Sequence, residues 1–226
     1  SLSFVRRQNP PLTYLHQRVK EIMTMTMKLL VSLLSLLTLP ALGADGDEAL
    51  FGLRWGMTVA EVKSAGVALT KTKGDRNLDV YKAPSMPKNL SDFESYGLVF
   101  ADGKLAKIWG ISKDISNDPS GSSGKERFET LRAALLQKYG QPRFNSQTVG
   151  NKLFKEYDEF YQCLKYSGCG HWFSSFESPD KVLSIELKGL SRGTGYLDIT
   201  AEAKPQWDKA LEVYKTRKNS SDKDAL

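Results

Sequence analysis

The chain of 226 residues carries 32 basic and 26 acidic side chains, a net charge of +6 that favours an anionic partner such as nucleic acid or a membrane surface. Much of the excess positive charge lies in residues 1–44. Without them, 27 basic and 25 acidic residues remain. The rest of the chain is therefore nearly balanced in charge, and we expect no nucleic acid as a partner.

A mostly apolar run near the N-terminus predicts export. Leu29–Leu39 follows a lysine and precedes a proline and several small residues, which is the order found in signal peptides. Its eleven residues are too few to cross a bilayer, which needs about 20. We expect residues 27–44 to be a signal peptide cleaved near Gly43 or Ala44, and residues 1–26 to be upstream or non-native sequence.

The first half of the remaining chain begins with a predicted strand at residues 51–56 and a short helix from residue 59 to 65. Thr58 stands at the helix start with Glu61 three residues later, a spacing typical of a capping box. Gly66 follows as the stop signal.

Further strands are predicted at residues 67–73, 78–83, 96–100 and 105–111. The last two are joined by Asp102-Gly103, a pair typical of tight hairpins. Residues 116–124 are turn formers and separate the two halves of the pattern.

The second half repeats this plan. Ser123 is the expected N-cap of a long helix that ends at Gly140, because Pro142 prevents continuation. Strands are predicted at residues 151–163, 172–177, 182–187 and 196–201. Pro205 then begins a last helix.

Hairpin-linked strands with intervening helices predict an α+β fold with antiparallel sheets and helices packed on one face. We expect one domain over residues 45–218, with halves at 45–115 and 124–218 that form helix-plus-strands units in tandem. Residues 219–226 are mostly polar and charged and predict a flexible tail.

The two cysteines, Cys163 and Cys169, lie within one short stretch that also contains His171. In an exported protein such a pair most often forms a disulfide, here across a hairpin. A catalytic pair of Cys169 and His171 and a zinc site at these residues are alternatives, and both need a free thiolate. We predict the disulfide, and expect neither a metal nor a cofactor.

Acidic residues offer a second route to chemistry. Glu156, Asp158 and Glu177 could form a carboxylate pair across a groove, as in glycoside hydrolases. Interleaved lysines favour instead a solvated sheet face. A hydrolase therefore stays an alternative hypothesis, with no catalytic residue assigned.

Aromatic residues crowd around the cysteines, and rigid aromatic side chains dominate protein interfaces. Core packing accounts for many of them, and a contact surface is the second interpretation. The candidate partner-binding residues are Tyr161, Tyr166, His171, Trp172 and Phe173.

Two short motifs resemble a known unit. Trp55-Gly56-Met57-Thr58-x-x-Glu61-Val62 resembles the helix start of many small bacterial envelope proteins, and Leu136-x-Lys138-Tyr139-Gly140-x-Pro142 resembles the helix ending of the same unit. That unit occurs in the small lipoprotein of the outer-membrane β-barrel assembly machinery, and a similar one is duplicated in the β-lactamase inhibitor proteins. The resemblance implies helices on an antiparallel sheet and a non-enzymatic interaction protein.

From these observations we expect a soluble, periplasmic or secreted protein without a membrane span, which binds a protein or another envelope macromolecule. A carrier of lipid or another small ligand is a further alternative, and it would need a sheet that encloses an apolar cavity.

Overall fold

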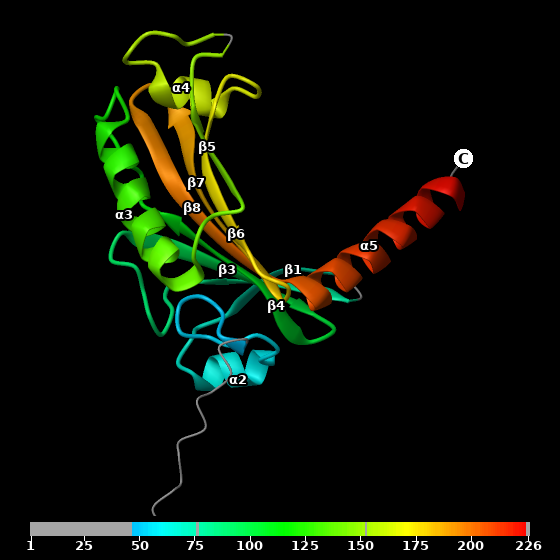
Figure 1. Cartoon of the computed structure of the whole chain (residues 1–226). Helices are drawn as coiled ribbons and strands as arrows, with labels where there is room; N and C mark the ends of the chain where they lie inside the picture. The colour runs from blue at the N-terminus through cyan, green and yellow to red at the C-terminus, as the bar shows by residue number, and fades with distance from the viewer. Residues whose placement is uncertain (1–46, 76, 152, 225–226) are drawn as a thin grey trace, which may run out of the picture. The chain divides into compact units, whose positions relative to one another are not determined.

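The computed structural model describes residues 47–75, 77–151 and 153–224, and Figure 1 colours these residues along the chain. They belong to the compact unit that begins at Asp45. The predicted signal peptide and the segment before it lie outside the described residues.

Eight antiparallel strands form one sheet in the order β1-β2-β3-β4-β8-β7-β6-β5. Their bounds are β1 Thr70–Asp75, β2 Leu78–Ala83, β3 Phe93–Ala101, β4 Lys104–Ser112, β5 Phe144–Thr148, β6 His171–Glu177, β7 Lys181–Ser191 and β8 Thr194–Ala203. Both halves of the chain thus share a single sheet, which they join along β4 and β8.

The strand order has an internal two-fold pattern about the β4–β8 seam. A helix precedes four consecutive strands in each half: α2 (Val59–Ser64) precedes β1–β4, and α3 (Ser122–Tyr139) precedes β5–β8. The predicted α+β class with tandem helix-plus-strands units is confirmed. Two helices lie outside the repeat, α4 (Phe160–Lys165) between β5 and β6 and α5 (Lys204–Asp224) after β8.

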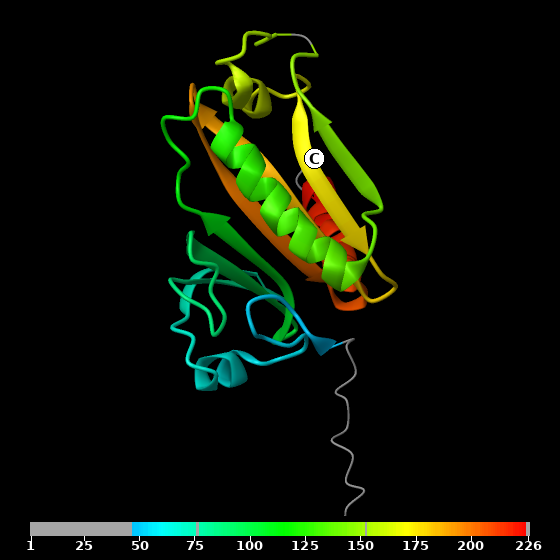
Figure 2. The ribbon, with the colours of Figure 1, turned by 60° about the vertical axis from the view of Figure 1, so that its left-hand side comes forward.

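The main core lies between α3 and one face of the sheet (Figure 2). Leu183, Ile185 and Leu187 alternate with polar residues along β7 and are almost fully buried, as a sheet covered on that face requires. Phe128 and Leu131 are the buried side chains with which α3 meets them. Burial of each such side chain stabilises the fold by about 2 kcal/mol.

Two ion pairs join α3 to the first half of the chain. Arg127 binds both carboxylate oxygens of Asp92, at 2.7 and 2.5 Å, and Lys138 lies 2.6 Å from Glu48. The guanidinium beside Asp92 lowers the pKa of that carboxyl, and the Lys138 hydrogen bond lowers the pKa of Glu48.

The last helix, α5, packs against the sheet on the face opposite to α3 (Figure 1). Ala210 of α5 is buried in a separate cluster with Ala101 and Ala106. The Lys107 ammonium lies 4.8 Å from the ring centre of Trp207, which is within the range of a cation–π contact.

Several predicted turn and cap signals are confirmed. The Thr58 hydroxyl accepts a hydrogen bond from the Glu61 N–H, and the Glu61 carboxylate accepts one from the Thr58 N–H, so α2 has its capping box. Asp102 and Gly103 have positive φ angles of 48° and 77° in the β3–β4 turn, and Gly140 ends α3.

Two predictions in these regions were wrong. Residues 51–56 form turns with one bridge from Glu48 to Arg54, because Phe51 has a φ of 59° and turns into the core against Tyr96. Ser123 does not cap α3. The helix begins at Ser122, and the carboxylate that accepts its early N–H, from Gly124, belongs to Asp118.

The region from residue 144 to 163 also differs from its prediction. The predicted strand at 151–163 is absent, and its place is taken by a loop and α4, whereas the short strand β5 lies earlier and was missed. At the C-terminus, α5 continues to Asp224, through residues expected to form a tail. None of the described helices combines the length and apolar character needed to cross a membrane.

Candidate functional site

The most distinctive surface feature is the excursion between β5 and β6, residues 149–170, which we call the β5–β6 lobe. It contains both cysteines and α4, and it lies at one end of the sheet (Figure 1). Residue 152 within it is outside the described residues.

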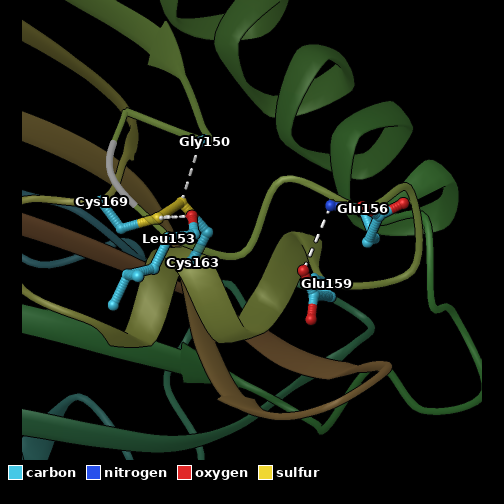
Figure 3. Close-up of a disulfide and its surroundings, with 6 residues drawn as sticks. All are labelled: Gly150, Leu153, Glu156, Glu159, Cys163 and Cys169. Carbon is cyan, nitrogen blue, oxygen red and sulfur yellow. Dashed lines mark hydrogen bonds between the residues drawn. A yellow bond between two sulfur atoms is a disulfide. The ribbon is translucent and has the colours of Figure 1, made fainter.

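A disulfide closes the lobe from inside (Figure 3). Cys163 on α4 and Cys169 in the turn before β6 are bonded, with Cα atoms 5.1 Å apart, and both are fully buried. The Gly150 N–H donates to Cys163 Sγ at 3.1 Å, and Asn151 N–H donates to the Cys169 carbonyl at 2.9 Å. Cys169 Sγ also lies 2.8 Å from the Leu153 carbonyl, a sulfur–oxygen contact because a disulfide carries no hydrogen.

The predicted Cys163–Cys169 bond is therefore present, but the predicted hairpin around it is not. The bond joins a helix to a turn and holds the incoming loop against both. With both sulfurs bonded to each other, neither can act as the nucleophile or zinc ligand that the alternatives with His171 require. In the described parts of the chain, no cluster of three or more His, Cys, Asp or Glu side chains is placed to hold a metal ion.

The lobe is seated on the sheet through Tyr161. A Cβ at Gly189 of β7 would lie 1.7 Å from the Tyr161 carbonyl, and one at Gly195 of β8 would lie 2.1 Å from its ring. Glycine at both positions therefore allows α4 to lie directly on the strands. This close approach fixes the position and direction of α4 relative to β7 and β8.

Tyr161 also forms the buried polar contact of the site. Its hydroxyl donates to Asp118 Oδ2 at 2.8 Å, and the same oxygen accepts the Gly124 N–H at 3.0 Å. Burial, together with the Asp118 carboxylate, raises the pKa of the Tyr161 hydroxyl. The lobe is thereby connected to the start of α3.

An aromatic pair supports the other side of α4. Phe160 is buried and meets Trp172 edge-on at 5.3 Å between ring centres. The Lys125 ammonium of α3 lies 4.1 Å from the centre of the Phe160 ring. Burial lowers the pKa of Lys125. Its ammonium group faces the Phe160 ring and donates a hydrogen bond to the Ser120 carbonyl at 2.8 Å.

Polar contacts tie the outer edge of the lobe to the β7–β8 turn. Arg192 forms an ion pair with Asp158, and Lys165 Nζ donates to the Leu190 carbonyl at 2.7 Å. These contacts, the disulfide and Tyr161 hold the lobe at several separate points.

The outer surface of this fixed lobe exposes two aromatic side chains. Tyr157 is 78 % exposed and Tyr166 is 49 % exposed. Phe154 lies between two surface pockets of about 450 and 480 Å³. The lining side chains include Lys125, Lys155 and Tyr157 in the first, and Lys165, Tyr166 and Arg192 in the second.

The five predicted contact residues do not form one surface. Tyr166 and His171 are exposed, whereas Tyr161 is fully buried and Trp172 packs against the core. Phe173 lies on the opposite sheet face beside Phe144, 6.0 Å between ring centres. The expectation of partner contact therefore does not fit Tyr161, because its side chain is enclosed by α3, α4 and the sheet.

Sequence reasoning did not select Tyr157, the most exposed of the large hydrophobic residues in the described chain. Reading residues 151–163 as a strand hid it among alternating positions. In the structure Phe160 and Tyr161 are buried because they lie in α4, whereas Tyr157 precedes this helix and is exposed.

The acidic residues proposed for a hydrolase are not brought together. Asp158 pairs with Arg192 in the lobe, whereas Glu177 pairs with Lys204 and Arg143 at the other end of β6. The Lys204 hydrogen bond lowers the pKa of Glu177. Six residues of strand separate Glu177 from the lobe side of β6, about 20 Å, so this arrangement does not favour a carboxylate pair.

No protein-family model matches this chain, and neither a curated protein nor a solved structure shows significant similarity to it.

Proposed function

We propose that this protein is an exported, non-enzymatic binding module that uses the β5–β6 lobe to hold another protein of the bacterial envelope. One observation carries the proposal. Of the seven large hydrophobic side chains that are exposed in the described residues, four lie on this lobe. They are Val149, Leu153, Tyr157 and Tyr166.

The lobe has the properties of an interface anchor. Exposed apolar groups gathered on one segment mark sites of interaction more often than scattered ones. Tyrosine supplies a large contact area with few rotatable bonds, and it is enriched among the residues that dominate binding energy. Because the disulfide and the Tyr161–Asp118 bond already fix the segment, binding would order little further backbone.

The two pockets beside Phe154 give this surface relief. Each is large enough to receive one side chain of a partner, and Lys155, which lines the first, can meet an acidic or carbonyl group. Protein interfaces combine an apolar centre with a polar rim, and aromatic rings beside basic side chains fit that pattern.

Export is part of the proposal. The disulfide is stable in an oxidising compartment such as the periplasm or the cell exterior, and the apolar run at Leu29–Leu39 has signal-peptide character. The motif resemblance to envelope proteins and the separated carboxylates Asp158 and Glu177 also favour binding over hydrolysis.

Site-specific photocrosslinking tests the proposal. The photoreactive residue p-benzoylphenylalanine replaces Tyr157 or Tyr166 in the full chain in cells, and replaces Tyr214 on α5 as the matched control, since that tyrosine is also exposed. We expect the same discrete partner to be crosslinked from positions 157 and 166 and not from 214.

Purified components then give the magnitude. Tyr157→Ala is expected to weaken binding of the identified partner by about 30-fold, equivalent to a hot spot of roughly 2 kcal/mol. Tyr214→Ala is expected to leave the affinity within twofold. Equal crosslinking from all three positions, or no loss with Tyr157→Ala, would contradict the proposal.

A further inference from the structure

The two edges of the sheet differ in a way that concerns self-association. β1 and β5 are the outermost strands, and every other residue of an edge strand directs its main-chain N–H and C=O away from the sheet. Such an edge can pair with another strand unless charge, proline or irregular geometry prevents it.

The β1 edge carries these protections. Lys71 and Lys73 lie in the strand, and the register with β2 shifts between them. Lys71 also pairs with Asp79 at 2.7 Å. A second strand approaching this edge would meet the Lys71–Asp79 ion pair and an irregular ladder.

The β5 edge carries none of them. Its sequence, Phe144-Asn-Ser-Gln-Thr148, has no charged residue and no proline, and it pairs with β6 in regular register over all five positions. Arg143, just before it, is paired with Glu177 at 2.8 Å. In Figure 2 no other part of the described chain lies beside the outer edge of β5.

The body of the protein holds β5 in shape from the inside. Gln147 Nε2 donates to Glu129 of α3 at 2.6 Å, and Asn145 is hydrogen-bonded to Ser174 of β6. Phe144 on the other face packs at 6.0 Å against Phe173. The strand is therefore preformed for pairing.

We propose that two copies of this chain associate through antiparallel pairing of their β5 edges, which joins their sheets into one of sixteen strands. The partner of the β5 edge is a second copy of this chain, because the strand is complementary to itself. With Ser146 opposite its own copy, all five residues pair, Phe144 lies opposite Thr148, and no like charges meet.

Pairing in this register also covers exposed apolar side chains at both ends of β5. The side chain of Phe144 is 57 % exposed at the start of β5, and Val149 is exposed just beyond its end. Antiparallel pairing about a two-fold axis brings the Phe144 end of each strand to the Val149 end of the other. Tyr157 and Tyr166 are not needed for this contact, so the inference goes beyond the proposed partner binding.

Cysteine crosslinking tests both the pairing and its register. Directly opposite residues in an antiparallel pair have Cα atoms about 4.5–5.5 Å apart, which a disulfide can span. Ser146→Cys is expected to give a covalent homodimer on mild oxidation. Thr148→Cys, on the same strand and face, is the control, because its copy would lie about 13 Å away along the strands and should not crosslink.

Sedimentation of the full chain gives the second readout. We expect reversible dimerisation at about 100–500 µM, because a contact of one strand pair belongs to the small, weak class of interfaces. Ser146→Lys places two ammonium groups opposite each other and should give only monomer, whereas Thr72→Lys on β1 should leave the dimer unchanged. A monomer at all concentrations, or crosslinking of Ser146→Cys to another protein instead of its copy, would overturn the proposal.

Discussion

The hydroxyl of Tyr161 on α4 donates a buried hydrogen bond of 2.8 Å to Asp118, the residue whose carboxylate also holds the first turn of α3. One side-chain pair thus connects the start of the long helix to the lobe that follows β5. Because both side chains are almost fully buried, neither can turn to water if the other is lost.

Removal of the Tyr161 hydroxyl should therefore be costly. Tyr161→Phe keeps the ring but leaves Asp118 with one fewer donor, and we expect a loss of about 1–3 kcal/mol in the free energy of unfolding, measured by urea denaturation. Tyr157→Phe, which removes an exposed hydroxyl, should change it by less than about 0.5 kcal/mol. Equal effects of the two substitutions would refute the role of the Tyr161–Asp118 bond.

The seat of α4 on β7 gives a second prediction. Gly189→Ala places a methyl group 1.7 Å from the Tyr161 carbonyl, and we expect it to destabilise the protein by about 3 kcal/mol or more, because backbone must move to relieve the overlap. Gly103→Ala is a suitable control. Its φ of 77° also disfavours a side chain, but no heavy atom lies within 4 Å, so about 1–2 kcal/mol is expected. Thermal unfolding of both variants measures the two losses, and a loss for Gly189→Ala no larger than for Gly103→Ala would contradict the close contact of α4 with β7.

Loss of the disulfide should loosen the lobe in preference to the sheet. For the double substitution Cys163→Ala with Cys169→Ala, opening a loop of about seven residues is expected to cost about 2 kcal/mol on the chain-entropy model. Hydrogen exchange should accelerate at Gly150 and Asn151, whose amides bond to the disulfide cysteines. Amides in the β3–β4 hairpin should accelerate only as far as the loss of global stability requires, and acceleration at Gly150 and Asn151 no greater than in that hairpin would contradict the local role of the bond.

The Asp92–Arg127 pair predicts a specific dependence on pH. Arg127 lowers the pKa of Asp92 below its ordinary value of 3.8, so the pair stabilises the folded state above that value. The stabilisation is lost as the pH falls through the lower pKa of the folded state.

A double-mutant cycle with Asp92→Asn and Arg127→Gln isolates this contribution. We expect a coupling free energy of about 0.5–1 kcal/mol at neutral pH, since the pair is partly exposed, and a decline once the pH falls below 3.8. Coupling that is unchanged in acid would show that charge is not its source.

The regular parts of the fold could be predicted from sequence because their signals are local. The alternation at Leu183, Ile185 and Leu187, the Asp102-Gly103 turn and the Thr58–Glu61 box each report on neighbours within a few residues. The tandem arrangement followed from the repeated order of such signals.

The site could be predicted only in part, because its geometry depends on distant residues. The six residues of α4 begin with two aromatic residues that favour strands. They form a helix because contacts with Gly189, Asp118 and the disulfide, all distant in sequence or formed only in the fold, hold them in place. β5 is an edge strand with little burial, so its sequence shows no apolar alternation. The disulfide followed from the expectation of export and the close spacing of the two cysteines, whereas no local signal shows which aromatic rings face solvent.

The measurement that tests the central claim most directly is photocrosslinking from position 166 in cells, with Tyr157 either intact or replaced by alanine. If the β5–β6 lobe is the binding surface, a discrete crosslinked partner appears with Tyr157 intact and is lost with Tyr157→Ala, although the protein stays folded and its disulfide intact. The same crosslink at undiminished yield with Tyr157→Ala, or equally from position 214 on α5, would contradict the claim.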